Sequence, residues 1–228
     1  MLRALIFDFD GLIADTETPE FSAWQNIFQA HRCDLHPLDW VHCIGTNGAL
    51  DPHLLLEEKS GLTLDRDQIR FRQKEILEEM LLAMQPCAGV VALIEEAKIR
   101  GLKLAVASSS SRRWVSRWLE QFQLAGHFDL LRNRDDVEKV KPDPALYVQT
   151  LAGLGVGPHE ALAFEDSLHG LRAARAAGLF TIVVPNGLTR HLALEEADLV
   201  LDSLEEFSLE LALQGAPPTR RPALGPPA

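Results

Sequence analysis

The chain has 228 residues, of which 46% are hydrophobic and 24% are charged, so it is long enough to bury a sizeable core. Its 33 acidic residues outnumber the 22 Lys and Arg residues, which gives a net charge of −11. No basic run occurs, and this argues against nucleic acid as a partner, because a phosphate backbone requires clustered Lys and Arg. No segment is long and apolar enough to span a bilayer, so we expect no membrane partner.

The cysteines, the N-terminal segment and the lack of heptads indicate the cellular location and the oligomeric state. Cys33, Cys43 and Cys87 are odd in number and form no CxxC pair, which is typical of a reduced compartment. Asp8 and Asp10 interrupt the first apolar run, which argues against a signal peptide. We therefore expect a cytoplasmic protein. The chain shows no coiled-coil heptads, and a monomer is the default expectation.

The first apolar run, Leu5 to Phe7, is followed at once by two acids and a glycine, at Asp8, Asp10 and Gly11. A continuous apolar run predicts a strand that is covered on both faces. Because strand side chains alternate, residues two apart should leave the strand on the same side. Two carboxylates this close repel, and a divalent cation such as Mg²⁺ would offset their charge. The alternative is a strand that simply ends in a polar turn.

Residues 16–86 predict a small all-helical insert. Thr16 to Pro19 is expected to be a hinge, since Pro is favoured at a helix start. Apolar residues then recur at helical spacing from Phe21 to Phe28 and again between Gln68 and Met84. A less regular loop, Gly45 to Gly48, lies between these two segments.

From Val90 onward, predicted helices and strands alternate, which indicates an α/β fold with a parallel sheet and helices on both faces. The helices are expected at 90–100, 112–123, 145–154, 168–177 and near 192, and the strands at 102–107, 128–131, 161–164, 180–184 and 199–201. Residues 215–228 are rich in Pro, Gly and Ala, and we expect them to form a disordered tail.

Polar residues follow several of these strands. Ser108 comes directly after the second predicted strand, and Glu165 and Asp166 come directly after the fourth. Lys141 is expected to open a helix just after the loop that follows the third strand. In open parallel sheets, ligands bind in the crevice at the carboxyl ends of the strands. These residues, with Asp8 and Asp10, therefore predict one site at that edge of the sheet.

The segments DFDGLIADT, VASSSS, KPDP and FEDSLHG, in this order and spacing, resemble the four motifs of the haloacid dehalogenase superfamily. The helical insert after the first motif is similar to the cap of the subgroup that contains phosphoglycolate phosphatase and β-phosphoglucomutase. The resemblance implies a Rossmann-like catalytic core of residues 1–15 and 87–214, a helical cap of residues 16–86, and Mg²⁺ as cofactor.

The same resemblance implies roles for the acids. Asp8 would be the nucleophile that forms an aspartyl-phosphate. Asp10 would be the general acid for the leaving oxygen and then the base that activates water, and its backbone carbonyl would bind the metal. Asp8, Asp166 and Glu165 would supply the other metal ligands, although Glu165 could instead hold a ligand in place.

The phosphoryl group would be held by the remaining motif residues. Ser108 would hydrogen-bond a phosphoryl oxygen, helped by the backbone N–H of Ser109 at a helix start. Lys141 would neutralise charge between Asp8 and the phosphoryl group. In the alternative interpretations, Ser108 caps the following helix and Lys141 is a surface charge.

The presence of Asp10 distinguishes this sequence from the dehalogenases, which lack the second acid because their leaving group needs no proton. Related mutases carry His where this chain has Glu20, and their cap loop carries an Arg that the loop around Asn47 lacks. We therefore expect hydrolysis of a small phosphorylated metabolite, such as a sugar phosphate or phosphoglycolate. Glu20, Asn47 and Arg112 could contact the leaving group. A β-phosphoglucomutase-like phosphotransferase stays open, and a non-catalytic scaffold is less favoured.

Overall fold

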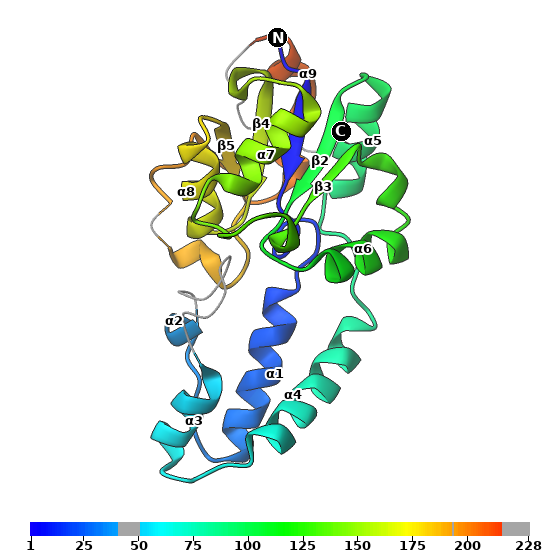
Figure 1. Ribbon diagram of the computed structural model, residues 1–228. Coiled ribbons are helices and arrows are strands. Elements are labelled where there is room, and N and C mark those ends of the chain that lie inside the picture. The colour runs from blue at the N-terminus through cyan, green and yellow to red at the C-terminus, as the bar shows by residue number, and fades with distance from the viewer. Residues whose placement is uncertain (41–50, 193, 216–228) are drawn as a thin grey trace, which may run out of the picture.

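The computed structural model describes residues 1–40, 51–192 and 194–215. These residues form a parallel sheet with helices on both faces, and a separate group of helices lies beyond the carboxyl ends of the central strands (Figure 1). The α/β class and the Rossmann-like sheet that the sequence predicts are confirmed. The expected tail lies outside the described residues, apart from Gly215.

The sheet has six strands in the order β3-β2-β1-β4-β5-β6, and all paired neighbours are parallel. The strands are β1 (Ala4–Phe7), β2 (Lys103–Ala107), β3 (Leu130–Arg132), β4 (Ala161–Glu165), β5 (Phe180–Val183) and β6 (Leu199–Val200). Strand β1 lies between β2 and β4, and Phe7 pairs with Val106 on one side and Phe164 on the other. The strand order reverses around β1, so the ends of β1, β2 and β4 border the crevice where such sheets bind ligands.

The α-helices are α1 (Glu17–Ala30), α2 (Pro37–Trp40), α3 (Pro52–Ser60), α4 (Arg66–Leu81), α5 (Val90–Ile99), α6 (Arg112–Gln121), α7 (Ala145–Leu154), α8 (Leu168–Ala176) and α9 (Leu209–Leu213). Short 3-10 helices occur at Ala125–His127, Arg134–Asp136, Pro158–Glu160, Thr189–His191 and Leu204–Glu206. No helix among the described residues combines the length and apolar character needed to cross a membrane.

Alternation along β1 divides the interior into two cores. Leu5 and Phe7 pack into the core that contains side chains of α5, α6 and α9. Ala4 and Ile6 face the opposite way, into a core formed with α7 and α8. All of β1 is buried, which explains why its sequence is a continuous apolar run rather than an alternating one.

Helices α1 to α4 form a helical lobe with its own core, which includes Phe21, Trp24, Phe28, Leu56 and Ile69 (Figure 1). Residues 16–40 and 51–85 contain no strand, as the sequence predicts for this part of the insert. The predicted loop Gly45 to Gly48 lies outside the described residues. The assignment of residues 16–86 to a cap and of 1–15 and 87–214 to a core stays a prediction.

Two connections join the lobe to the sheet, and they lie side by side. Ala14 forms an isolated bridge with Pro86, and the backbone N–H of Cys87 donates to the carbonyl of Ile13 at 2.8 Å. The outgoing and returning chains are therefore tied together where they leave the sheet.

Some element ends differ from those predicted. The helix α6 stops at Gln121 because Gln123 adopts a left-handed conformation with φ of 60°, which an α-helix does not continue through. Strand β3 begins two residues later than expected, where Leu130 pairs with Ala105 of β2. Hydrophobic periodicity does not report either constraint.

Candidate active site

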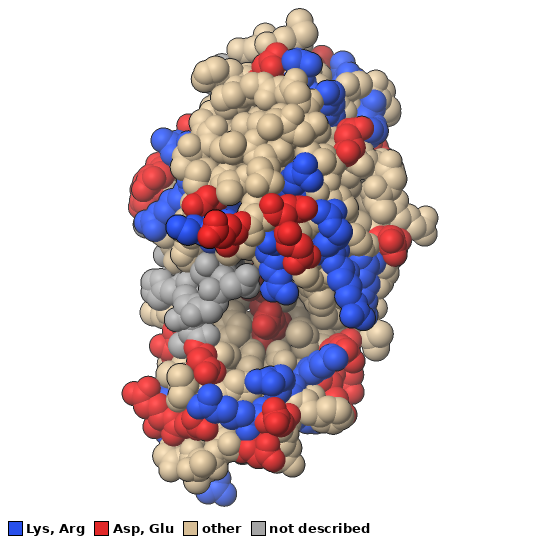
Figure 2. Space-filling model, viewed as in Figure 1, with Lys and Arg blue, Asp and Glu red and all other residues tan. Residues whose placement is uncertain are grey.

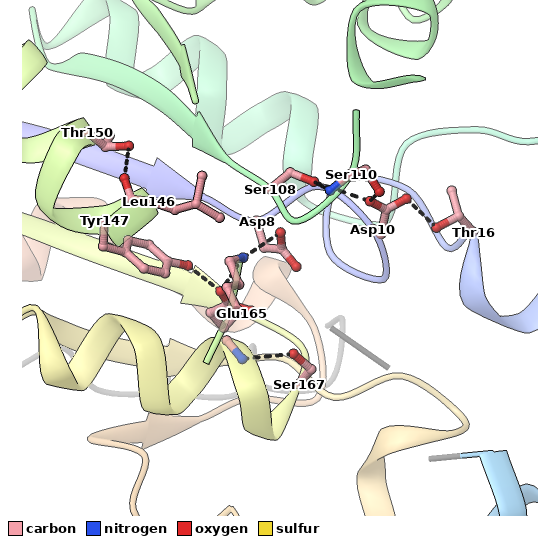
Figure 3. Close-up of polar contacts among 12 residues, drawn as sticks. Asp8, Asp10, Thr16, Ser108, Ser110, Leu146, Tyr147, Thr150, Glu165 and Ser167 are labelled. Carbon is pink, nitrogen blue, oxygen red and sulfur yellow. Dashed lines mark hydrogen bonds and ion pairs between the residues drawn. The ribbon is translucent and has the colours of Figure 1, made fainter. Parts of the chain in front are cut away.

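Asp8 and Asp10 lie just beyond β1, which ends at Phe7. Asp8 extends the sheet pairing by one residue, since its backbone N–H donates to the carbonyl of Phe164 at 2.9 Å. Asp10 lies in the turn that follows, so strand alternation does not govern its direction. Both acids lie beyond the strand rather than within it, and their carboxylates contact different groups (Figure 3).

Lys141 is buried, with 1% of its side chain exposed, and lies between two carboxylates. Its Nζ is 2.7 Å from Asp8 Oδ1 and 2.7 Å from Glu165 Oε1. Burial alone would lower the pKa of this amine, but the charges of Asp8 and Glu165 outweigh burial and raise the pKa of Lys141. The side chain is therefore an ammonium, and the interpretation of Lys141 as a surface charge is wrong.

Tyr147 on α7 is a further member of this network that nothing in the sequence marks. Its hydroxyl donates to Glu165 Oε1, the oxygen that also contacts Lys141. Burial and the nearby charge of Glu165 raise the pKa of Tyr147 well above its usual value, so the phenol remains a donor. In the sequence, Tyr147 stands on the apolar side of a helix, where a core residue and a site residue look alike.

Asp8, Glu165 and Asp166 are buried, and each offers a carboxylate oxygen within 4.8 Å of the others. Within the described part of the chain, Glu165 Oε2 and Asp166 Oδ1 are buried without a hydrogen-bond partner. Burial and the charge of Glu165 raise the pKa of Asp8 to about 8, although Lys141 opposes the shift. One ammonium does not offset three buried carboxylates, and their unpartnered oxygens suit a hard divalent cation.

Glycines make room for these acids. A Cβ at Gly170, in the first turn of α8, would lie 1.8 Å from Glu165 Oε2, and a Cβ at Gly11 would lie 2.0 Å from Asp166 Oδ2. Asn186 holds Asp166 through an Nδ2 to Oδ2 hydrogen bond of 2.9 Å. A side chain at either glycine would have to displace the carboxylate beside it.

The carboxylate of Asp10 receives hydrogen bonds on both oxygens (Figure 3). Thr16 Oγ1 and the indole Nε1 of Trp114 each donate to Oδ1 at 2.8 Å. Ser110 Oγ donates to Oδ2 at 2.6 Å, and Ser108 Oγ lies 3.3 Å from the same oxygen. Of these donors, the sequence indicates only Ser108 as a site residue.

The serines at 108–111, which follow β2, make two separate sets of hydrogen bonds. Ser111 is the N-cap of α6, and its side chain accepts from the backbone N–H of Trp114, so the interpretation of Ser108 as the cap of this helix is wrong. Ser108 is instead buried, accepts from the N–H of Ser110 at 3.0 Å and faces Asp10. Ser109 follows Ser108 in the same loop.

The described residues that were predicted to contact the leaving group lie in different surroundings. Glu20 lies in the first turn of α1; although its side chain is exposed, neighbouring protein atoms and then the charge of Asp10 raise its pKa. The pKa of Glu17, which no sequence motif marks, is raised more strongly by the same influences. Arg112 contacts Asp136 with its guanidinium, at 2.7 Å, rather than Asp8 or Asp10. Asn47 lies outside the described residues.

The molecular surface is hollowed between the sheet and the helical lobe (Figure 2). An acidic side chain is visible inside the hollow, and both basic and acidic side chains lie around its rim. A small anionic molecule could reach the crevice from this face.

The fold and the acidic crevice define a hydrolase of the haloacid dehalogenase class. The family model described as haloacid dehalogenase-like hydrolase matches residues 5–184, and the chain belongs to this family. It is 42% identical over 213 residues to the Bacillus subtilis protein named "Putative phosphatase YhcW", covering 93% of this chain and 97% of that protein.

Other similar proteins carry related names. The phosphorylated carbohydrates phosphatase of Thermotoga maritima is 32% identical, over 87% of this chain and 93% of that protein. The crystal structure of CbbY from Rhodobacter sphaeroides in complex with phosphate superposes with a TM-score of 0.71 at 32% identity, and the match covers 90% of this chain and 96% of that one.

Gly170→Ala tests the close approach of α8 to Glu165. We expect the new Cβ to displace the Glu165 carboxylate and to lower the free energy of unfolding by about 1–3 kcal/mol, as overpacking does elsewhere. Urea unfolding measures the change. Gly126→Ala is the matched control, because a Cβ there meets no atom within 4 Å. Equal stability of the two variants would contradict the contact.

Proposed function

We propose that this protein is a Mg²⁺-dependent phosphatase that hydrolyses a small sugar phosphate through an aspartyl-phosphate on Asp8. The observation that carries the proposal is the buried pairing of Asp8 with Lys141 beside Glu165 and Asp166, at the crevice of the sheet. The names of the similar proteins support the same chemistry.

Asp8, Glu165 and Asp166, with the backbone carbonyl of Asp10, would hold the Mg²⁺ ion. When bound, the ion supplies positive charge that offsets the charge of the phosphoryl group and of the acids. The fit rests on the unpartnered oxygens of Glu165 and Asp166 described above. Glu165 also accepts from Lys141 and Tyr147 through its other oxygen, so it would both ligate and hold Lys141 in place.

The reaction proceeds in two displacements. A carboxylate oxygen of Asp8 attacks phosphorus as the bond to the leaving oxygen breaks, and Asp10 gives that oxygen a proton. Asp10 then takes a proton from water, whose oxygen attacks the phosphorus, so inorganic phosphate leaves and Asp8 is regenerated. Lys141, Ser108 and the N–H of Ser109 hold the phosphoryl oxygens throughout.

The acids at the start of α1 favour an uncharged leaving group. Glu17 and Glu20 lie close enough to Asp10 for its charge to affect both. Sugar hydroxyls can hydrogen-bond these acids in either protonation state, whereas the carboxylate of phosphoglycolate would be repelled by whichever of them is ionised. This favours a sugar phosphate as substrate. Contacts from Asn47 and Arg112 to the sugar stay predictions.

We also propose that the protein is a cytoplasmic monomer. Cys33 and Cys87 are free, which suits a reducing compartment. The proposed substrate, a small sugar phosphate, is itself a soluble metabolite.

A panel of phosphorylated metabolites tests the activity, with phosphate release as the readout. We expect sugar phosphates to be hydrolysed faster than phosphoglycolate. Asp8→Asn should lower kcat about a thousandfold or more, because it removes the nucleophile. Asp34→Asn, an exposed residue of the lobe, is the matched control and should retain full activity.

The mutase alternative has a direct test in the same assay. β-Glucose 1-phosphate is supplied with a trace of the 1,6-bisphosphate. Glucose 6-phosphate forming without phosphate release would favour a phosphotransferase, whereas phosphate release alone supports hydrolysis. If wild type and Asp8→Asn show the same rate on every compound, only a scaffold role remains.

Stabilisation by Mg²⁺ should increase with pH. The pKa of Asp8 is raised from 3.8 to about 8, so the folded, metal-free protein binds a proton that the unfolded chain releases between these values. Its stability therefore falls as pH rises through this window. Mg²⁺ competes with that proton, and its apparent affinity should rise by up to about tenfold per pH unit for each proton displaced.

Calorimetric Tm values at pH 6 and pH 8, with and without Mg²⁺, measure this dependence. Potassium chloride at matched ionic strength controls for screening. A Tm increase that is the same at both pH values would contradict a metal site containing Asp8.

A further inference from the structure

Among the side chains that donate to Asp10 in the described part of the chain, Trp114 is the one that lies within a helix. It lies in the first turn of α6, and its Nε1 is 2.8 Å from Asp10 Oδ1. The ring packs edge-on against Trp118, with centroids 5.7 Å apart, and Trp118 is almost fully buried in the core against the sheet. The indole is thus fixed by the packing of α6.

The other donors to Asp10 belong to different surroundings. Thr16 lies in the connection to the helical lobe, and Ser108 and Ser110 belong to the loop after β2. Their hydroxyls rotate and can both donate and accept. An indole N–H only donates, in one direction set by the ring, and it cannot take the proton that Asp10 must deliver.

We propose that Trp114 is a positioning residue that orients Asp10 toward the leaving oxygen of the substrate. The inference rests on the proposed function, because it takes Asp10 as the general acid. A carboxylate transfers a proton efficiently only when it is within hydrogen-bond reach in the right direction. The N–H of Trp114 holds Asp10 in that orientation, because the indole ring is itself held against Trp118.

Trp114→Phe keeps an aromatic ring and removes the N–H. Its effect should depend on the leaving group, so kcat/KM is measured for β-glycerol phosphate and for p-nitrophenyl phosphate. The alcohol needs a proton as it departs, whereas p-nitrophenolate leaves as a stable anion. We expect kcat/KM to fall about tenfold or more for β-glycerol phosphate, part of the roughly 10²–10⁴-fold that acid catalysis contributes. For p-nitrophenyl phosphate it should change less than about threefold.

Trp40→Phe is the matched control. Trp40 is buried in the core of the helical lobe, away from Trp114, and within the described residues its Nε1 has no hydrogen-bond partner. This variant should leave the ratio of the two kcat/KM values unchanged. Asp10→Asn should show the same selective loss as Trp114→Phe, and larger.

Equal losses on both substrates, or no loss on either, would overturn the role of Trp114. A wild-type enzyme inactive on both would instead overturn the proposed function. The contact is also tested without catalysis, by the indole ¹H–¹⁵N resonances. Asp10→Ala should move the resonance that Trp114→Phe eliminates, while those of Trp24 and Trp40 in the lobe stay in place. A Trp114 resonance that does not move contradicts the contact.

Discussion

The charge balance around one buried ammonium is the constraint on which the rest of the site depends. Lys141 has almost no exposure to water and contacts Asp8 and Glu165 at equal distances. Removing one partner from such a buried pair typically costs about 3–5 kcal/mol, because a charge is left without compensation. The third acid, Asp166, leaves the cluster negative, so it favours a bound cation.

The fold brings these groups together through the position of β1. Strand β1 is central, and its neighbours on either side deliver Ser108 and Glu165 to the same edge. Lys141 and Tyr147 arrive from the region leading into α7, on one face of the sheet, whereas Trp114 arrives from α6 on the other. One face of the sheet therefore supplies a partner of Asp8, and the other supplies a partner of Asp10.

Much of this arrangement could be predicted from the sequence because its signals are local. The buried run before Asp8, and the acids Glu165 and Asp166 at the end of β4, mark strand ends directly, and the carboxyl ends of parallel strands meet on one side of the sheet. Trp114, Tyr147 and Asn186 could not be predicted, because each acts through contacts with residues distant in the chain. Their residue types equally suit an apolar core or a loop. Most partners of Asp10 also escaped prediction, because Thr16, Ser110 and Trp114 reach it from three separate segments.

Gly170 allows α8 to lie directly against the Glu165 carboxylate. The first turn of α8 passes so close to the Glu165 carboxylate that a Cβ at position 170 would lie 1.8 Å from Glu165 Oε2. The glycine therefore leaves the space into which Glu165 points, and a side chain at this position would compete with the acid for that space.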